Sequence, residues 1–217
     1  MREGMIYDTD QYQLRDYIVE RMNEIIQSNR TAKAGGVVFF GDSLTQFLNL
    51  KKFFPEYPLA YNCGIAGITS DMLLHFIDEG VLKYQPKLVY LMVGTNDLGN
   101  TIMMSPRQIA LNVKEIVEII HYNLPEAKIN LLSCIPCVES VQSYMAKGTT
   151  LRRNDTLRMV FEEYQRVIPY EYVHMIDMFD ALFDEKGQLD DADFKDGLHV
   201  TDHGYEKLVK AVKNQIQ

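Results

Sequence analysis

Short apolar runs alternate with amphipathic stretches along the whole chain. Several of these runs end in Gly, which is typical of short buried strands followed by a turn. The run at 87–94 is almost continuously apolar, as expected for a strand covered on both faces. The pattern predicts strands at 35–41, 59–64, 87–94, 127–133 and 171–177.

Apolar residues recur at helical spacing between and beyond these runs. Thr69 or Ser70 is placed to cap one such stretch, and Gly80 stands where a helix would stop. Ser105 is placed to cap another, with Pro106 as its first residue. The pattern predicts an N-terminal helix at about 10–28 and further helices at 69–79, 105–120, 157–168 and 205–212.

The alternation of strands and helices predicts one fold class. Parallel strands joined by right-handed helical crossovers give a doubly wound five-stranded sheet in a three-layer α/β/α sandwich. The chain shows no internal repeat, linker or low-complexity segment, so we expect a single domain over 1–217 with the N-terminal helix packed on it.

Ligand sites in such sheets lie beyond the carboxyl ends of the strands. Four polar clusters follow predicted strands or precede the last helix, at 41–43, 62–67, 94–97 and 196–199. We expect all four clusters to meet at one rim of the sheet.

Composition narrows the function classes. The chain has 217 residues, 47% of them hydrophobic, and a formal net charge of -8, which argues against a nucleic-acid partner because phosphates need a basic face. No apolar run is long enough to span a membrane, and the polar start lacks a signal-peptide core, so we expect a cytoplasmic protein. Cys63, Cys134 and Cys137 form neither a disulfide framework nor a zinc motif, and no cofactor motif is present.

The rim clusters contain the residue types needed for nucleophilic catalysis. Ser43 follows a predicted strand, and a hydroxyl becomes a useful nucleophile when a base takes its proton. Asp196 and His199 stand close enough in a turn to touch, so that Asp196 could orient His199 as that base. Loop hydrogen bonding and capping explain the same pair without catalysis. His203 is a second candidate base at the start of the last helix.

Acyl transfer also needs donors for a developing oxyanion. Gly67 lies between a strand end and a helix start, where backbone N–H groups are unpaired. Asn96 follows the third strand and offers a side-chain amide, and the Ser43 N–H would be a third donor. Turn formation explains either Gly67 or Asn96 taken alone.

Taken together, these clusters resemble a known family. "FFGDSLTQ", "YNCGIAGITS", "VGTNDLG" and "DGLHVTDHGY" are similar, in order and spacing, to the successive blocks of the GDSL, or SGNH, hydrolases. The resemblance implies a flavodoxin-like sandwich and metal-independent hydrolysis of esters or thioesters. It implies Ser43 as nucleophile, Asp196 and His199 as acid and base, and Gly67 and Asn96 in the oxyanion hole.

The same blocks contain two further acidic residues and one position that differs from the family's usual motif. Asp42 and Asp97 are expected to be structural. Ile68 stands where many members carry Asp. The loop around Gly67 therefore lacks a side chain that would stabilise it in those members, but the Gly67 N–H can still donate to an oxyanion. The blocks are most similar to small bacterial proteins resembling the platelet-activating-factor acetylhydrolase catalytic subunit, which implies removal of a short acyl group such as acetyl.

The expected function is therefore a serine esterase acting on a small-molecule ester. A carbohydrate O-deacetylase, a lysophospholipase or a thioesterase of the same family would use the same residues, and a binding module with a vestigial site is the non-enzymatic alternative. Aromatic residues at 47–57 suit ordinary packing best, although they would also suit a substrate pocket or the interface of a homodimer.

Overall fold

The computed structural model describes residues 15–99, 104–140 and 152–216. A five-stranded sheet with all neighbours parallel lies at its centre, in the order β2-β1-β3-β4-β5. The strands are β1 (Val37–Gly41), β2 (Ala60–Gly64), β3 (Leu88–Met92), β4 (Lys128–Leu132) and β5 (Val173–Ile176). After β1, the chain adds β2 at one edge of β1 and then crosses over to add β3 at the other edge. This reversal of direction places a topological switch point between β1 and β3.

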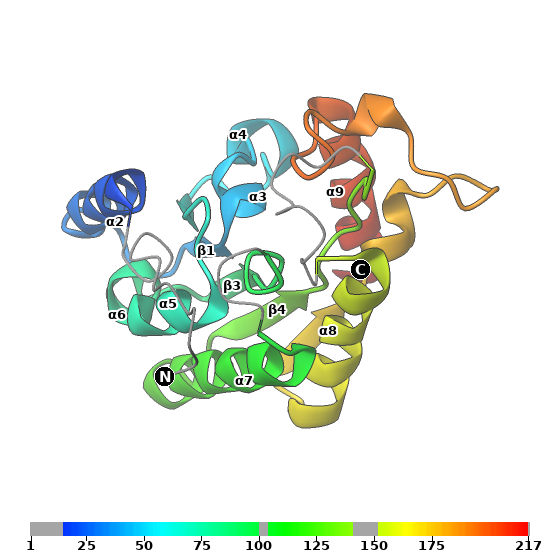
Figure 1. Cartoon of the computed structure of the whole chain (residues 1–217). Coiled ribbons are helices and arrows are strands. Elements are labelled where there is room, and N and C mark those ends of the chain that lie inside the picture. Colours follow the sequence, from blue (N-terminus) through cyan, green and yellow to red (C-terminus); the bar gives the residue numbers. More distant parts are fainter. Residues whose placement is uncertain (1–14, 100–103, 141–151, 217) are drawn as a thin grey trace.

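Helices cover both faces of this sheet, which confirms the predicted three-layer fold (Figure 1). One face carries α2 (Asp16–Asn29), α5 (Ser70–His75), α7 (Pro106–Asn123) and α8 (Asn154–Val167), whose apolar residues share one core. The other face carries α4 (Leu50–Phe53) and α9 (Asp202–Ile216) around a second core. Short 3-10 turns lie at Leu82–Tyr84, Phe179–Leu182 and Asp191–Asp193.

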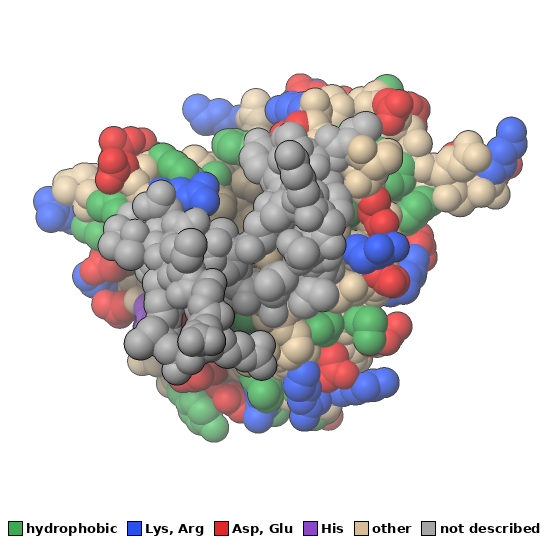
Figure 2. Space-filling view, in the orientation of Figure 1, with side chains coloured by type: hydrophobic (Ala, Val, Ile, Leu, Met, Phe, Trp, Pro, Cys, Tyr) green, Lys and Arg blue, Asp and Glu red, His purple; other side chains and the backbone are tan. Residues whose placement is uncertain are grey.

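Charged side chains of both signs are mixed around the rim of the face in Figure 2, where Lys and Arg lie among Asp and Glu. This mixture offers no continuous basic surface on the described part of that face, in agreement with the negative net charge. Among the described residues, no helix is both long and apolar enough to cross a bilayer.

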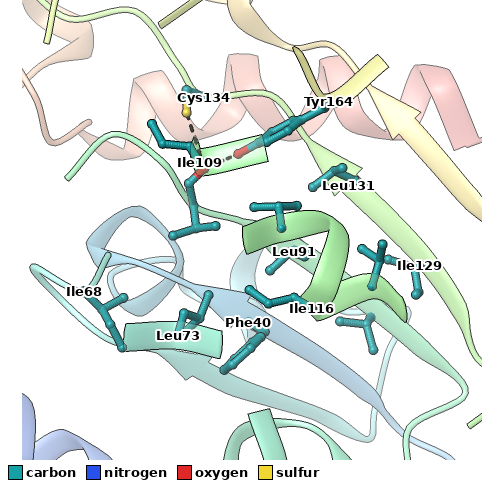
Figure 3. Close-up of a cluster of buried hydrophobic side chains, with 14 of the residues drawn as sticks. Phe40, Ile68, Leu73, Leu91, Ile109, Ile116, Ile129, Leu131, Cys134 and Tyr164 are labelled. Atoms are coloured by element: carbon teal, nitrogen blue, oxygen red, sulfur yellow. Dashed lines mark hydrogen bonds between the residues drawn. The ribbon is translucent and has the colours of Figure 1, made fainter. Parts of the chain in front are cut away.

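Alternate residues of the central strands enter opposite cores. Phe40 of β1 and Leu91 of β3 join the core beneath α5 and α7, which Figure 3 shows in close-up. Their neighbours Phe39 and Tyr90 face α9 and stack with ring centroids 4.6 Å apart. Burial on both faces explains why these strands are apolar at every position.

The segment predicted as one helix ending at Gly80 differs in the structure. It forms two short helices, α5 and α6 (Ile77–Gly80), separated by Phe76. Gly80 is the last residue of α6 rather than the residue after it. A Cβ at this position would come within 2.4 Å of the Phe40 ring. The helical segment therefore ends at Gly80 as expected, and the absence of a side chain there also permits close packing of α6 on β1.

Other helix ends follow the predicted capping. Thr69 caps α5, and Ser105 forms a capping box with Gln108 at the start of α7. The described part of the N-terminal helix runs from Asp16 to Asn29. Its predicted start near residue 10 lies outside the described residues.

Candidate active site

Ser43 is the first residue of the short helix α3 (Ser43–Gln46), directly after β1. The turn is tight because Gly41 packs against β3, where a Cβ would lie 2.1 Å from the Met92 carbonyl oxygen. Asp42, not Ser43, caps α3: its Oδ1 accepts a hydrogen bond of 2.9 Å from the Leu44 N–H. Ser43 is therefore not needed as a cap, although its side chain is almost fully buried.

Asp196 and His199 form the second part of the site. Asp196 Oδ1 accepts hydrogen bonds from the backbone N–H groups of Leu198 (3.0 Å) and His199 (2.7 Å). Asp196 Oδ2 lies 2.7 Å from His199 Nδ1, and His199 Nε2 lies 3.0 Å from Ser43 Oγ. The structure thus joins the three residues that the sequence pattern singled out.

The electrostatics of this pair follow from its contacts. Burial opposes ionisation of Asp196, but hydrogen bonds from His199 and the Leu198 amide outweigh it and hold the Asp196 pKa below its ordinary value. Asp196 therefore stays ionised at neutral pH. An ionised acceptor at Nδ1 favours the tautomer with its proton on Nδ1, which leaves Nε2 free to accept the Ser43 proton.

The loop that carries this pair is held by the backbone around it. Lys195 N–H donates to the His199 carbonyl at 2.7 Å, and Val138 N–H donates to the Gly197 carbonyl at 2.8 Å. His203, the second candidate base, lies in the first turn of α9 with its Nδ1 2.7 Å from Asp193 Oδ1. The contact with Ser43 is made by His199 and not by His203.

Gly67 and Asn96 lie close to each other in the loops that follow β2 and β3, the two strands that flank β1. Gly67 adopts φ +77, a conformation that glycine tolerates best. The Asn96 carboxamide nitrogen donates to the Ile68 carbonyl oxygen at 3.0 Å, next to Gly67. Among the described residues, the backbone amides of Ser43 and Gly67 donate no backbone hydrogen bond.

Comparison of the sequence with models of known protein families identifies the family of this chain. The model of the GDSL-like lipase/acylhydrolase family matches residues 39–207. The chain belongs to this family. The match includes every residue that the sequence analysis placed in the site.

Relatives of this GDSL-like acylhydrolase carry consistent names. Platelet-activating factor acetylhydrolase IB subunit alpha1 of Bos taurus is 28% identical over 180 residues, covering 81% of this chain and 72% of the relative. Subunit alpha2 of Rattus norvegicus is 29% identical over 188 residues, covering 85% of this chain and 77% of the relative.

Solved structures agree with these names. A structure from Streptococcus pneumonia, whose description refers to platelet activating factor, has a TM-score of 0.80 and 25% identity, covering 93% of this chain and 95% of that chain. A structure described as a GDSL-like lipase from Bacteroides thetaiotaomicron has a TM-score of 0.69, covering 90% and 96%, but its 23% identity supports the fold alone. The protein is therefore an ester-hydrolysing enzyme with the SGNH hydrolase fold.

Sequence reasoning missed one residue of this acylhydrolase site, Arg152. Its side chain is almost fully buried, its Nε donates to the Thr95 carbonyl at 2.9 Å, and its Nη2 lies 3.5 Å from Asn96 Oδ1. Burial lowers the pKa of this guanidinium, while nearby ionisable groups that include Asp42 oppose the shift. Arg152, one of two adjacent Arg residues in a polar stretch, gave no signal, because its partners are more than fifty residues away in the sequence.

Asp97 braces the loop on the same side, as expected. Its carboxylate accepts hydrogen bonds from the Ser70 N–H (2.9 Å) and from the Ser70 hydroxyl. Burial raises the Asp97 pKa to about 6 against these two hydrogen bonds. This contact links the loop after β3 to the start of α5, and it holds the Gly67 loop although Ile68 replaces the usual Asp.

Cys134 and Tyr164 both contact the backbone at the end of β3, just before the Asn96 loop. Tyr164 donates to the Val93 carbonyl at 2.8 Å, and Cys134 Sγ lies 3.5 Å from the same oxygen (Figure 3). Cys63, Cys134 and Cys137 are all buried, and none of them forms a disulfide within the described part of the chain. Burial raises the pKa of Cys63 to about 12 and that of Cys134 well above its ordinary value, so neither is a reactive thiolate.

The aromatic residues after Ser43 divide into two groups. Phe53 and Phe54 are buried in the core under α9, which confirms ordinary packing and removes them from any subunit interface. Phe47 instead has 47% of its surface exposed and meets the His199 ring edge-on, with centroids 5.3 Å apart. Phe47 is therefore the aromatic residue of this group that stands beside the site.

Proposed function

We propose that this acylhydrolase is a serine esterase that removes a short acyl group, such as acetyl, from a small-molecule ester without a metal ion. The observation that carries the proposal is the pair of short contacts from Asp196 through His199 to Ser43. An oriented base within hydrogen-bond reach of a hydroxyl is what an acyl-serine mechanism requires.

In the first step, the Ser43 oxygen attacks the ester carbonyl carbon while His199 Nε2 takes the hydroxyl proton. Asp196 stabilises the resulting imidazolium, because its carboxylate already accepts from Nδ1 at 2.7 Å. The tetrahedral intermediate then expels the alcohol. His199 returns the proton to the leaving oxygen, which must therefore lie on the His199 side of the site.

The negative charge on the carbonyl oxygen needs donors that are already in place. The backbone N–H groups of Ser43 and Gly67 are two such donors in this proposal, and the Asn96 nitrogen has a second hydrogen beyond the one that bonds Ile68. Arg152 holds the Asn96 oxygen on the opposite side and so orients the amide nitrogen toward the pocket. Arg152 acts in this proposal as a positioning residue.

Water completes the cycle by the same route. His199 takes a proton from water, the hydroxide attacks the acyl-Ser43 carbonyl, and the collapsing intermediate releases the carboxylic acid and restores the Ser43 hydroxyl. Both halves of the reaction use one base and one set of oxyanion donors.

The relatives named as acetylhydrolases support the choice of a short acyl group. The leaving alcohol meets Phe47, because this exposed ring lies against His199. An aromatic surface there accepts the apolar face of a phenol, a sugar or a lipid alcohol.

A chain-length series tests the proposal. Wild type is expected to hydrolyse p-nitrophenyl acetate and butyrate faster than the octanoate, and Ser43→Ala is expected to lose several orders of magnitude in kcat with an unchanged thermal transition. An acetylated sugar, an acetyl phospholipid, a lysophospholipid and an acyl thioester, assayed in parallel, separate the alternatives. Near-normal turnover by Ser43→Ala would reject the mechanism, and a preference for octanoate would reject the short acyl group.

A further inference from the structure

Helix α2 lies before the residues that the family model matches, yet it is fixed to the rim of the active site. Arg21 donates from Nε to the Gly64 carbonyl at 3.0 Å and from Nη2 to the Asn62 carbonyl at 2.7 Å, at the carboxyl end of β2. Ile18 and Ile25, three and four residues from Arg21 on the adjoining part of the same helix face, are buried in the core. Polar and apolar contacts together therefore define the position of α2.

Tyr17 lies one helical turn before Arg21 and so points toward the same end of β2. Its hydroxyl lies 2.7 Å from the position that a Cβ on Gly67 would occupy. The ring is 44% exposed, and the hydroxyl has no hydrogen-bond partner among the described residues. A side chain at position 67 would collide with this hydroxyl, so Gly67 leaves room for Tyr17 as well as adopting a positive φ.

The hydroxyl is close to the reacting carbonyl group. Standard bond lengths and one hydrogen bond from the Gly67 N–H place the oxyanion within about 8 Å of the Tyr17 hydroxyl, as an upper bound. A substituent of three or four heavy atoms on the carbonyl carbon spans such a distance.

Tyr17 and His199 belong to opposite layers of the sandwich. Helix α2 belongs to the layer with α5 and α7, whereas His199 directly precedes α9 in the other layer (Figure 1). The leaving alcohol must lie on the His199 side to receive its proton. The acyl group, on the remaining substituent position of the tetrahedral carbon, therefore extends toward Tyr17.

We propose that Tyr17 determines acyl-group specificity by hydrogen bonding to an oxygen atom in the acyl chain. This inference rests on the proposed function, since it assumes attack by Ser43. A short acetyl group leaves the hydroxyl hydrated. A plain alkyl chain that covers it removes its water without replacing the hydrogen bond, whereas an ether or hydroxyl oxygen at the same place restores the bond. The substrate class is thus a small ester whose acyl group is either very short or oxygen-bearing.

The test uses two esters of equal size, p-nitrophenyl butyrate and p-nitrophenyl methoxyacetate, in which an ether oxygen replaces one methylene group. The kcat/KM ratio of methoxyacetate to butyrate is measured for wild type and Tyr17→Phe, so that their different chemical reactivities cancel. We expect the wild-type ratio to be about tenfold higher than that of Tyr17→Phe. We also expect acetate turnover to agree within about twofold, because acetyl does not reach the hydroxyl.

Matched variants separate recognition from folding. Tyr122→Phe on α7 removes a hydroxyl from a highly exposed ring and should leave the ratio unchanged. Arg21→Gln weakens the anchor of α2 and should lower the ratio toward that of Tyr17→Phe, whereas Arg30→Gln, whose side chain bonds Gln27 on the same helix, should not.

The outcomes distinguish this inference from the proposed function. Equal ratios in wild type and Tyr17→Phe, or equal losses on all three esters, would overturn the role of Tyr17 while leaving the serine mechanism in place. An unchanged ratio in Arg21→Gln would overturn positioning by α2. Acetate turnover that does not require Ser43 would remove the proposed function and this inference with it.

Discussion

The two sides of Ser43 are built differently. On one side, Asp196 and His199 come from a single turn and are joined by contacts within four consecutive residues. On the other side, Gly67 and Asn96 come from separate loops that are held by buried charges, Asp97 and Arg152. A local base and a dispersed set of oxyanion donors should therefore respond differently to substitution.

The largest effect is expected from the local side. His199→Ala should lower kcat by about 10⁴-fold or more, because no other base is in contact with Ser43 among the described residues. His203→Ala is the matched control, since His203 stands four residues later and contacts Asp193 instead. The measurement is kcat for ester hydrolysis by both variants. A comparable loss of kcat in His203→Ala would contradict the assignment of His199 as the only base.

Asn96→Ala tests the dispersed side and should cost about 10²–10³ in kcat with little change in KM. The loss falls on kcat because the oxyanion exists only in the transition state and intermediate. Asn123→Ala, at the exposed end of α7, is the control and should retain full activity. A change confined to KM would make Asn96 a substrate-binding residue.

Arg152 should act through Asn96 and therefore show a smaller effect. Arg152→Gln should lower kcat about tenfold at similar KM, and Arg152→Lys should recover part of this loss by keeping the charge. In an Asn96→Ala background, we expect the Arg152→Gln change to cost less than about twofold. Independent, multiplicative losses in the double variant would contradict positioning through Asn96.

The smallest effect concerns Asp42, which precedes Ser43 and caps α3. Burial raises the Asp42 pKa to about 7 despite the hydrogen bond from the Leu44 N–H, whereas the ordinary value is 3.8. The folded protein therefore binds more protons than the unfolded chain between these two pH values. The stabilisation is complete below pH 3.8 and is lost as the pH rises to about 7, at up to about 1.4 kcal/mol per pH unit.

Asp42→Asn should flatten this pH dependence. Asn can still accept from the Leu44 N–H as a helix cap but carries no charge. Chemical denaturation at pH 5, 6 and 7 is the measurement, and the wild-type unfolding free energy should fall with pH more steeply than that of the variant. Asp97, with a pKa raised to about 6, keeps part of the slope in both proteins. Parallel slopes would show that Asp42 does not titrate in this range.

The comparison of the two sides also explains what the sequence could predict. Strand runs, caps and the spacing of Asp196 and His199 are local patterns, and the structure has the sheet, the Ser105 cap and the Ser43–His199 contact. The break at Phe76 and the contact of Gly80 with Phe40 depend on packing between distant segments. No local pattern encodes such contacts.

Arg152 and Tyr17 escaped prediction for the same reason. Arg152 reaches Thr95 and Asn96 from a distant part of the chain, and Tyr17 reaches Gly67 from a helix that the family blocks do not include. In the sequence, each is an ordinary polar or aromatic residue. The roles of all these side chains in catalysis stay predictions until activity is measured.

Labelling by a serine-directed phosphonate tests the central claim most directly, because it reports the nucleophile without any assumption about the natural ester. Mass mapping of the treated enzyme should place one adduct on the peptide containing Ser43, and His199→Ala should slow the labelling strongly while His203→Ala does not. An adduct on another residue, or full esterase activity in a protein whose Ser43 is quantitatively labelled, would contradict the account.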